Sequence, residues 1–351
     1  MTNPYLIVKI FEILLFSSYF AISGCSTNTV LQEEPLPDTE GSVKVAKWKD
    51  DKKAALTFML DDSTPGQATL GLPAMNKRNL IGTWFVNPGT DYFADYRNYW
   101  EKIAPEGGQE LADHTMNHIG ASNPAEVLYE VGEAAKVIWK IRGEEIYSSL
   151  IAFQKGGSTE WDEASLNQVI KQFNLIDRDN NNLGESHYGA SIQDGENTQQ
   201  MSKRITEIIN STRWGLLTFH GIAKNAGSPP MDDGWAGVWI NDFETFLDNV
   251  VAHTSELWVG GYIQVYKYIK ERQTAKVSIN QFSDSKFKVY LTSEMDEKYY
   301  NEPLTLIVNL PSGWTNCVVS QNDYKQSFNV KNGVLMCNGL PNKGDIIIEK
   351  Q

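Results

Sequence analysis

The sequence has 351 residues, of which 41% are hydrophobic and 21% are charged, values that are ordinary for a globular protein with a sizeable core. Its 44 acidic residues outnumber 31 basic ones and give a formal net charge of −13. Such a field repels phosphate backbones, which argues against a nucleic acid partner, and it disfavours polyanionic glycans. A neutral or cationic polymer is the easier ligand.

The N-terminal segment has the features of an export signal. Lys9 precedes an apolar run that ends at Ile22 and is shorter than the roughly 20 residues of a membrane-spanning helix. The run ends in Ile22-Ser23-Gly24-Cys25, which resembles the lipobox of a bacterial lipoprotein. We expect residues 1–25 to be a lipoprotein signal and Cys25 to carry the lipid, which places the protein on a membrane in the periplasm or at the cell surface. An ordinary secretory signal is the alternative.

Residues 26–47 are polar and acidic and contain two prolines, so we expect a flexible tether. From residue 48 to 272 short apolar strands alternate with helices, which predicts a parallel sheet, either a barrel or a doubly wound one. The expected strands are 54–60, 82–86, 110–112, 150–153, 215–219 and 257–259, and the expected helices are 70–78, 96–103, 124–138, 163–173, 241–253 and 262–272.

After residue 272 the apolar period changes to two, and Gly-containing turns separate the runs. We expect residues 273–351 to form a small antiparallel β-sandwich that serves packing or glycan contact. Cys317 and Cys337 both lie in this segment. An exported compartment permits a disulfide between them, but the sequence leaves their pairing open.

Three polar clusters directly follow predicted buried strands. Asp61-Asp62 follows the first strand, His114 and His118 follow the third, and His220 follows the strand at 215–219. The carboxyl ends of parallel strands form the rim where α/β folds place their sites. The four-residue spacing would also bring both imidazoles to one side of a helical turn, where they can share a metal.

In this order the segments resemble the polysaccharide deacetylase family, also called the NodB homology or family 4 carbohydrate esterase domain. Its motif His-(Ser/Thr)-x-x-His is matched fully at residues 114–118, and its Thr-Phe-Asp-Asp-Gly motif aligns with Met59-Leu60-Asp61-Asp62-Ser63. Further likenesses lie at Gly82-Thr83-Trp84-Phe85-Val86, Gly107–Asp113 and Leu217–His220. The resemblance spans roughly residues 48–272 and implies a distorted (β/α) barrel of the NodB type.

Two departures stand out. Ser63 occupies the place of the glycine that follows the aspartate pair. The family's Arg-x-Pro-Tyr motif is absent, and Phe153-Gln154-Lys155-Gly156-Gly157 fills that stretch. The arginine that would position the base therefore has no certain counterpart.

The resemblance implies roles for the matched residues. Asp62, His114 and His118 would hold a divalent metal, and a set of two nitrogen donors and one oxygen donor favours Zn²⁺. Asp61 would be the general base that works on a zinc-bound water, and His220 the acid that protonates the leaving group. The expected reaction is hydrolysis of an acetyl group from a carbohydrate, more readily N-linked than O-linked.

Three further side chains are candidate substrate contacts. Trp235 and Trp239 follow His220 in a Gly-rich segment and could stack on sugar rings, although core packing is the commoner role of tryptophan. His187 is expected in a polar loop that could line the cleft. The alternatives are an O-acetyl esterase acting on xylan-like polymers and a non-catalytic glycan-binding lipoprotein. A zinc protease does not fit, because the residue after His114 is Thr115 rather than the glutamate that such enzymes use as base.

Overall fold

The computed structural model describes residues 40–157, 159–180, 183–224 and 233–351. The expected signal, including Cys25, and most of the expected tether lie outside these residues. Within the described part of the tether, Val43–Val45 form a strand, β1, that pairs with β14 (Leu304–Asn309). Residues Pro37–Gln351 form one compact unit.

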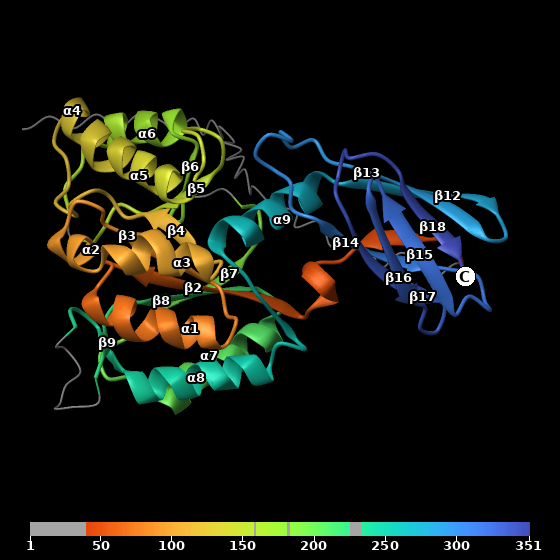
Figure 1. Ribbon diagram of the computed structural model, residues 1–351, viewed down its shortest axis with the longest axis horizontal. Helices are drawn as coiled ribbons and strands as arrows, with labels where there is room; N and C mark the ends of the chain where they lie inside the picture. The colour runs from red at the N-terminus through yellow and green to blue at the C-terminus, as the bar shows by residue number, and fades with distance from the viewer. Residues whose placement is uncertain (1–39, 158, 181–182, 225–232) are drawn as a thin grey trace, which may run out of the picture. The chain divides into compact units, whose positions relative to one another are not determined.

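A parallel sheet is the centre of the fold (Figure 1). It is an open, distorted (β/α) barrel, as expected, with one gap between its two edge strands. In spatial order the strands are β6 (Leu175–Asp177), β5 (Ile151–Phe153), β4 (Glu110–Asp113), β3 (Gly82–Val86), β2 (Ala54–Asp61), β8 (Trp214–Phe219) and β7 (His187–Ser191), while β11 (Leu257–Val259) also pairs with β2.

Helices follow most of these strands, and several are interrupted by π-helical turns. The helical segments are η1 (Lys49–Asp51), η2 (Gln67–Gly71), α1 (Leu72–Lys77), α2 (Asp91–Asp95), η3 (Tyr99–Ile103), α3 (Ala104–Glu106), α4 (Pro124–Val127), η4 (Leu128–Glu133), α5 (Ala134–Ile141), α6 (Glu163–Gln172), α7 (Thr198–Ser211), α8 (Ile240–Ala252) and α9 (Tyr262–Thr274). No helix of the described residues has the length and apolar character needed to cross a membrane.

The two faces of β2 show how the sheet is buried. All eight of its residues are buried. Leu56, Phe58 and Leu60 belong to the core shared with the surrounding helices, whereas Ala55 and Met59 belong to a second core cluster that also contains residues of α9 and of the C-terminal strands. A strand that is buried on both faces reads as a continuous apolar run, which is why it was visible in the sequence. The polar residues begin where this run ends.

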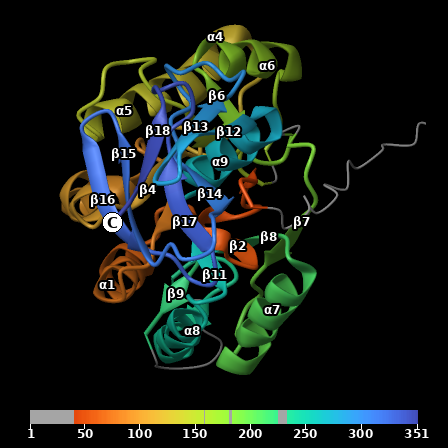
Figure 2. The same cartoon turned by 90° about the vertical axis from the view of Figure 1, so that its right-hand side faces the viewer.

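The C-terminal strands form two antiparallel sheets, as expected, and both are seen in Figure 2. One contains β1, β14 and β17 (Val334–Gly339), and the other contains β12 (Lys276–Ser283), β13 (Lys286–Thr292), β18 (Ile346–Lys350), β15 (Asn316–Gln321) and β16 (Tyr324–Asn329). Side chains of both sheets share the second core cluster. Cys317 and Cys337 are both buried in it, and both thiols are free.

Candidate active site

Asp62, His114 and His118 converge at the carboxyl ends of β2 and β4. The Nε2 atom of His114 lies 3.2 Å from Oδ1 of Asp62, and Nε2 of His118 lies 3.6 Å from the same oxygen. One ligand atom from each residue falls within 4.8 Å of the others. Ligands about 2.0–2.2 Å from a tetrahedral metal are separated from each other by roughly 3–3.5 Å. The two distances to Asp62, 3.2 and 3.6 Å, are close to this separation, so the three side chains could hold a metal ion.

The hydrogen bonding of His114 supports the same conclusion. Its Nδ1 atom lies 2.9 Å from the carbonyl oxygen of Gln154, so Nδ1 carries the proton and donates it. The other ring nitrogen, Nε2, is the one that faces Asp62. Metal-binding histidines commonly donate their second ring nitrogen to a carbonyl in this way, which fixes the ring and its tautomer.

The expected helical turn at the histidine pair is wrong. Residues 114–120 form an irregular loop, in which Thr115 and His118 have φ values of 69° and 60°. The side chains meet because the loop folds back on itself, and the ring centroids of the two histidines lie 4.9 Å apart. The four-residue spacing therefore pointed to two histidines that do lie together, although the loop does not form the helical turn on which that prediction was based.

Asp61 is held by an arginine that the sequence did not reveal. Arg178, the residue after β6, donates two hydrogen bonds to the carboxylate, of 2.7 Å to Oδ1 and 2.6 Å to Oδ2. Its guanidinium also lies over the ring of Phe85, 4.4 Å from the centroid. Burial opposes ionisation of Asp61, but the charge and hydrogen bonds of Arg178 together with the nearby His114 and His220 outweigh it and lower the pKa of Asp61 to about 2. This arginine follows β6, whereas the stretch in which the resemblance predicted one, Phe153–Gly157, begins at the end of β5.

His220 lies beside Asp61, with Nε2 3.8 Å from Oδ2 of the carboxylate, beyond hydrogen-bond length. Burial lowers the pKa of His220, against the opposing charges of Asp61 and Asp62, so the imidazole is neutral at neutral pH. Its Nδ1 atom is buried and has no hydrogen-bond partner in the described part of the chain. Trp235 packs edge-on against this ring, with centroids 4.6 Å apart.

Two buried polar side chains join the turns after β2 and β8. Gln67 donates from Nε2 to the carbonyl oxygens of Asp61 and His220, at 2.5 and 2.6 Å. The carboxylate of Asp233 accepts hydrogen bonds from Gly66 N and Ile222 N, at 2.5 and 3.0 Å. These bonds fix the base candidate and the acid candidate relative to each other.

Ser63 has a structural use that glycine could not supply. Asp62 and Ser63 have φ values of 83° and 49°, the left-handed region that favours glycine. The buried hydroxyl of Ser63 accepts a hydrogen bond of 3.0 Å from the backbone N–H of Asn87. Asn87 in turn donates from Nδ2 to the carbonyl oxygens of His114 and Thr115. The aspartate turn and the histidine loop are therefore connected through one asparagine.

The remaining candidate residues are Trp235, Trp239 and His187. Trp235 is 57% exposed beside His220, which suits a substrate contact. Trp239 ends β10 (Val238–Trp239), is half-buried and precedes α8. His187 begins β7 rather than lying in a loop, and it lines a cavity of about 240 Å³ together with Arg178 and Ser191. His187 therefore lines the same cavity as Arg178, the residue that binds Asp61.

Comparison with known proteins supports a carbohydrate-related family for part of the chain. Residues 46–169 match the family model described as polysaccharide deacetylase. A gellan lyase from a Bacillus species is 22% identical over 338 residues, which cover 89% of this chain. The chain spans only 13% of that relative's length.

Two solved structures of similar proteins are described as a polysaccharide deacetylase and an acetyl xylan esterase. One is a putative polysaccharide deacetylase from Mycobacterium smegmatis, 13% identical, with a TM-score of 0.43 over 66% of this chain and 94% of the other. Another is a family 4 acetyl xylan esterase from Clostridium thermocellum in complex with a cobalt ion, 15% identical, with a TM-score of 0.37 over 60% of this chain and 90% of the other.

Proposed function

We propose that the protein is a metal-dependent hydrolase that removes acetyl groups from a carbohydrate. The observation that carries this proposal is the adjacency of two different carboxylates. Asp62 lies with two imidazoles in a metal-binding geometry, while its neighbour Asp61 is kept off them by Arg178. A metal-dependent hydrolytic site uses a metal-ligand set and a separate base, and the match of residues 46–169 to the polysaccharide deacetylase family supports the same chemistry.

Asp62, His114 and His118 would hold the metal, and two nitrogens with one oxygen favour Zn²⁺. When bound, such a metal polarises a carbonyl group and lowers the pKa of water. The proton transfers would be carried out by residues of the chain. Asp61, ionised and fixed by Arg178, accepts a proton from the attacking water at its Oδ2 edge, which is the edge nearest His220.

His220 would deliver the proton to the leaving group. Its imidazole is neutral, so it would first receive the proton that Asp61 takes from the attacking water, which returns Asp61 to its ionised form. Nε2 of His220 and Oδ2 of Asp61 are 3.8 Å apart, so the two groups would have to approach each other for this transfer. Trp235 shields one side of the ring and offers an exposed aromatic face to a sugar. Because the net charge is −13, a neutral or cationic polymer suits the surface better than a polyanion.

The substrate class is tested by acetate release from the zinc-loaded protein. The panel contains N-acetylated chitooligosaccharides and O-acetylated xylan, with an Asp61→Asn variant as the control for catalysis. We expect release from the N-acetylated sugars, lowered at least 100-fold in the variant. Release from xylan alone would favour the O-acetyl esterase. Glycan binding with no acetate from any substrate would overturn the hydrolase and favour a glycan-binding lipoprotein.

We also propose that the protein is exported and anchored through a lipid on Cys25. The support is the run of residues that ends in Ile22-Ser23-Gly24-Cys25. Labelling cells with a radioactive fatty acid tests this, since the label should enter the wild-type protein and not a Cys25→Ser variant. Equal labelling of both would contradict the anchor.

A further inference from the structure

The loop that carries both histidine ligands has a conformation that needs external support. Thr115 and His118 adopt left-handed backbone angles, which disfavour residues other than glycine, asparagine and aspartate. Packing does not supply that support on the outer side, because Ile119 is 73% exposed and borders an open cavity of about 670 Å³. The loop must therefore be held by hydrogen bonds.

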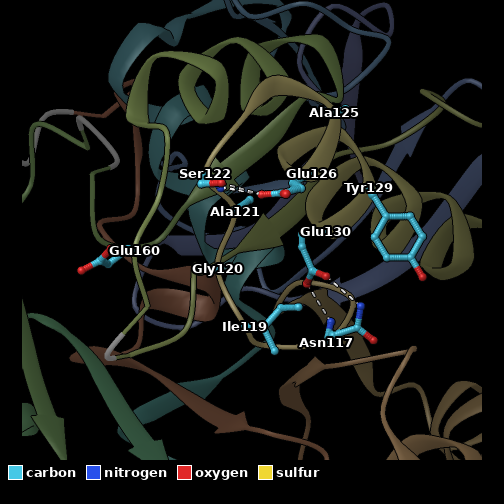
Figure 3. A pocket seen from close by; sticks show the side chains of 10 residues that line it. All are labelled: Asn117, Ile119, Gly120, Ala121, Ser122, Ala125, Glu126, Tyr129, Glu130 and Glu160. Atoms are coloured by element: carbon cyan, nitrogen blue, oxygen red, sulfur yellow. Dashed lines mark hydrogen bonds between the residues drawn. The ribbon is translucent and has the colours of Figure 1, made fainter.

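Glu130 makes three of these bonds, and Figure 3 shows the two that it makes with Asn117. Its carboxylate accepts hydrogen bonds from the backbone N–H of Asn117 at 2.8 Å and from Asn117 Nδ2 at 2.7 Å. Its backbone carbonyl accepts a third, of 2.6 Å, from the N–H of Met116. The Glu130 residue is 3% exposed, so these bonds are protected from water.

The helix around Glu130 explains why its carbonyl faces the loop. Glu130 lies in η4, where Leu128–Glu133 form π-helical turns between two α-helical segments. A π-bulge displaces the regular hydrogen-bond ladder, and such bulges occur frequently at functional sites. Here the main chain and the side chain of one residue contact two consecutive loop residues, directly before His118.

Other residues also restrain the loop. The carboxylate of Asp113 accepts from Thr115 N at 2.8 Å, and the hydroxyl of Thr115 accepts from His118 N at 3.0 Å. Asn87 holds the carbonyl oxygens of residues 114 and 115, and the N–H of Gly89 donates to the carbonyl oxygen of Met116 at 2.8 Å. Glu130 holds the N–H groups of residues 116 and 117 and the side chain of Asn117.

We propose that Glu130 is a positioning residue of the metal centre, which sets the distance between the two imidazoles by fixing Met116 and Asn117. The proposal rests on the metal-binding part of the proposed function and on no particular substrate. Residues that orient metal ligands typically contribute about 10–100-fold to metal affinity. The carboxylate of Glu130 should act through this route without touching metal or substrate.

Glu130→Gln is the direct test, because it keeps the shape of the side chain but leaves a single oxygen to accept two donors. Glu126→Gln is the matched control. Glu126 lies one turn earlier, borders the same cavity and is also hydrogen bonded, but its partner is Ser122. Zn²⁺ affinity is measured on the full chain by competition with a chromogenic chelator, and the site geometry by the visible absorption of bound Co²⁺. Thermal unfolding of the metal-free proteins reports whether each variant is folded.

We expect Glu130→Gln to fold, to bind Zn²⁺ about 10–100-fold more weakly and to change the Co²⁺ spectrum, while Glu126→Gln keeps both values of the parent. Should Glu130→Gln not fold, Asn117→Ala removes the Nδ2 donor alone and should weaken Zn²⁺ binding severalfold. Zn²⁺ affinity equal to the control in a folded Glu130→Gln, or in Asn117→Ala where that variant is needed, overturns the positioning role. Failure of the parent to bind Zn²⁺ or Co²⁺ overturns the proposed function as well, so the two failures are distinguishable.

Discussion

Arg178 and Asp61 are 117 residues apart in the chain and form a two-bond ion pair inside the barrel rim. The side chains of both are almost completely buried, at 9% and 3% exposure. The pairing keeps Asp61 ionised and turns it away from the imidazoles that Asp62 faces. Two consecutive aspartates thereby acquire different partners, and this difference is the basis of the proposed division into base and metal ligand.

Replacement of this arginine should damage both stability and catalysis. Arg178→Met leaves the Asp61 carboxylate buried without its partner, which typically costs about 3–5 kcal/mol of unfolding free energy. Arg178→Lys keeps the charge but loses the paired geometry, so its loss should be smaller in stability and still large in acetate release. Urea unfolding and acetate release at saturating zinc measure the two effects.

Arg78→Met is the control for Arg178→Met. Arg78 also donates two hydrogen bonds to one carboxylate, that of Asp248, but this acid is exposed. Solvent screens such a pair, so the variant should unfold close to the parent and retain its activity. Equal destabilisation by both variants would contradict a special role for the buried pair.

Gly156 should be required for metal binding because of its closeness to His118. Its φ is +58°, and a Cβ atom at this position would lie 2.5 Å from Nε2 of His118. Gly143 has a similar φ of +69° but open space around it. Both alanine variants therefore carry the backbone strain, whereas only Gly156→Ala should also weaken Zn²⁺ binding, by more than about 10-fold. Chelator competition separates the two, and equal affinities would rule out the steric explanation.

Trp235 should contribute to binding of a sugar rather than to folding. It is 57% exposed and packs against His220. We expect Trp235→Ala to raise KM for an oligosaccharide on the order of fivefold, the loss of one aromatic contact, with little change in thermal stability. Phe282→Ala, at an exposed aromatic of the C-terminal sheets, is the control and should leave KM unchanged. A KM shift in both variants would contradict the assignment of Trp235 as a sugar-binding residue.

Glu271 should make the unfolding free energy depend on pH. Burial raises the pKa of Glu271 to about 7, partly offset by the hydrogen bond from Glu302 N. The folded protein then binds a proton that the unfolded chain releases near pH 4.5, so stability falls as pH rises from about 4.5 to about 7 and is level above that. Glu271→Gln should flatten this dependence in urea unfolding between pH 5 and 8, and Glu106→Gln, at an exposed site, should not.

The strand ends were the part of the site that the sequence could predict. Continuous apolar runs that stop at a polar residue located Asp61, Asp62, His114 and His220, because a strand buried on both faces leaves an unambiguous pattern. Arg178 was missed because β6 has only three residues, and the arginine stands between two aspartates that read as a polar loop. Its role depends on a contact across 117 residues, which no local pattern contains.

Among the other elements that were not predicted, α7 and β7 differ in the signal that their sequences carry. α7 begins with a capping box formed by Asn197 and Gln200, which is a helix-start signal visible in the sequence. β7 has the sequence His-Tyr-Gly-Ala-Ser and none of its residues is buried, so it shows no apolar pattern and is defined by its pairing with β8. The conformation of the histidine loop was also beyond the sequence, because it depends on Glu130 and Asn87 from other parts of the fold.

The metal content of the full chain tests the central claim most directly. The parent protein and a His114→Ala variant are equilibrated with Zn²⁺, freed of loosely bound metal by dialysis, and analysed by mass spectrometry for zinc per chain. We predict about one zinc per chain in the parent and nearly none in the variant, with both proteins folded by circular dichroism. A folded parent without zinc, or equal zinc in both proteins, would contradict the assignment of Asp62, His114 and His118 as a metal centre.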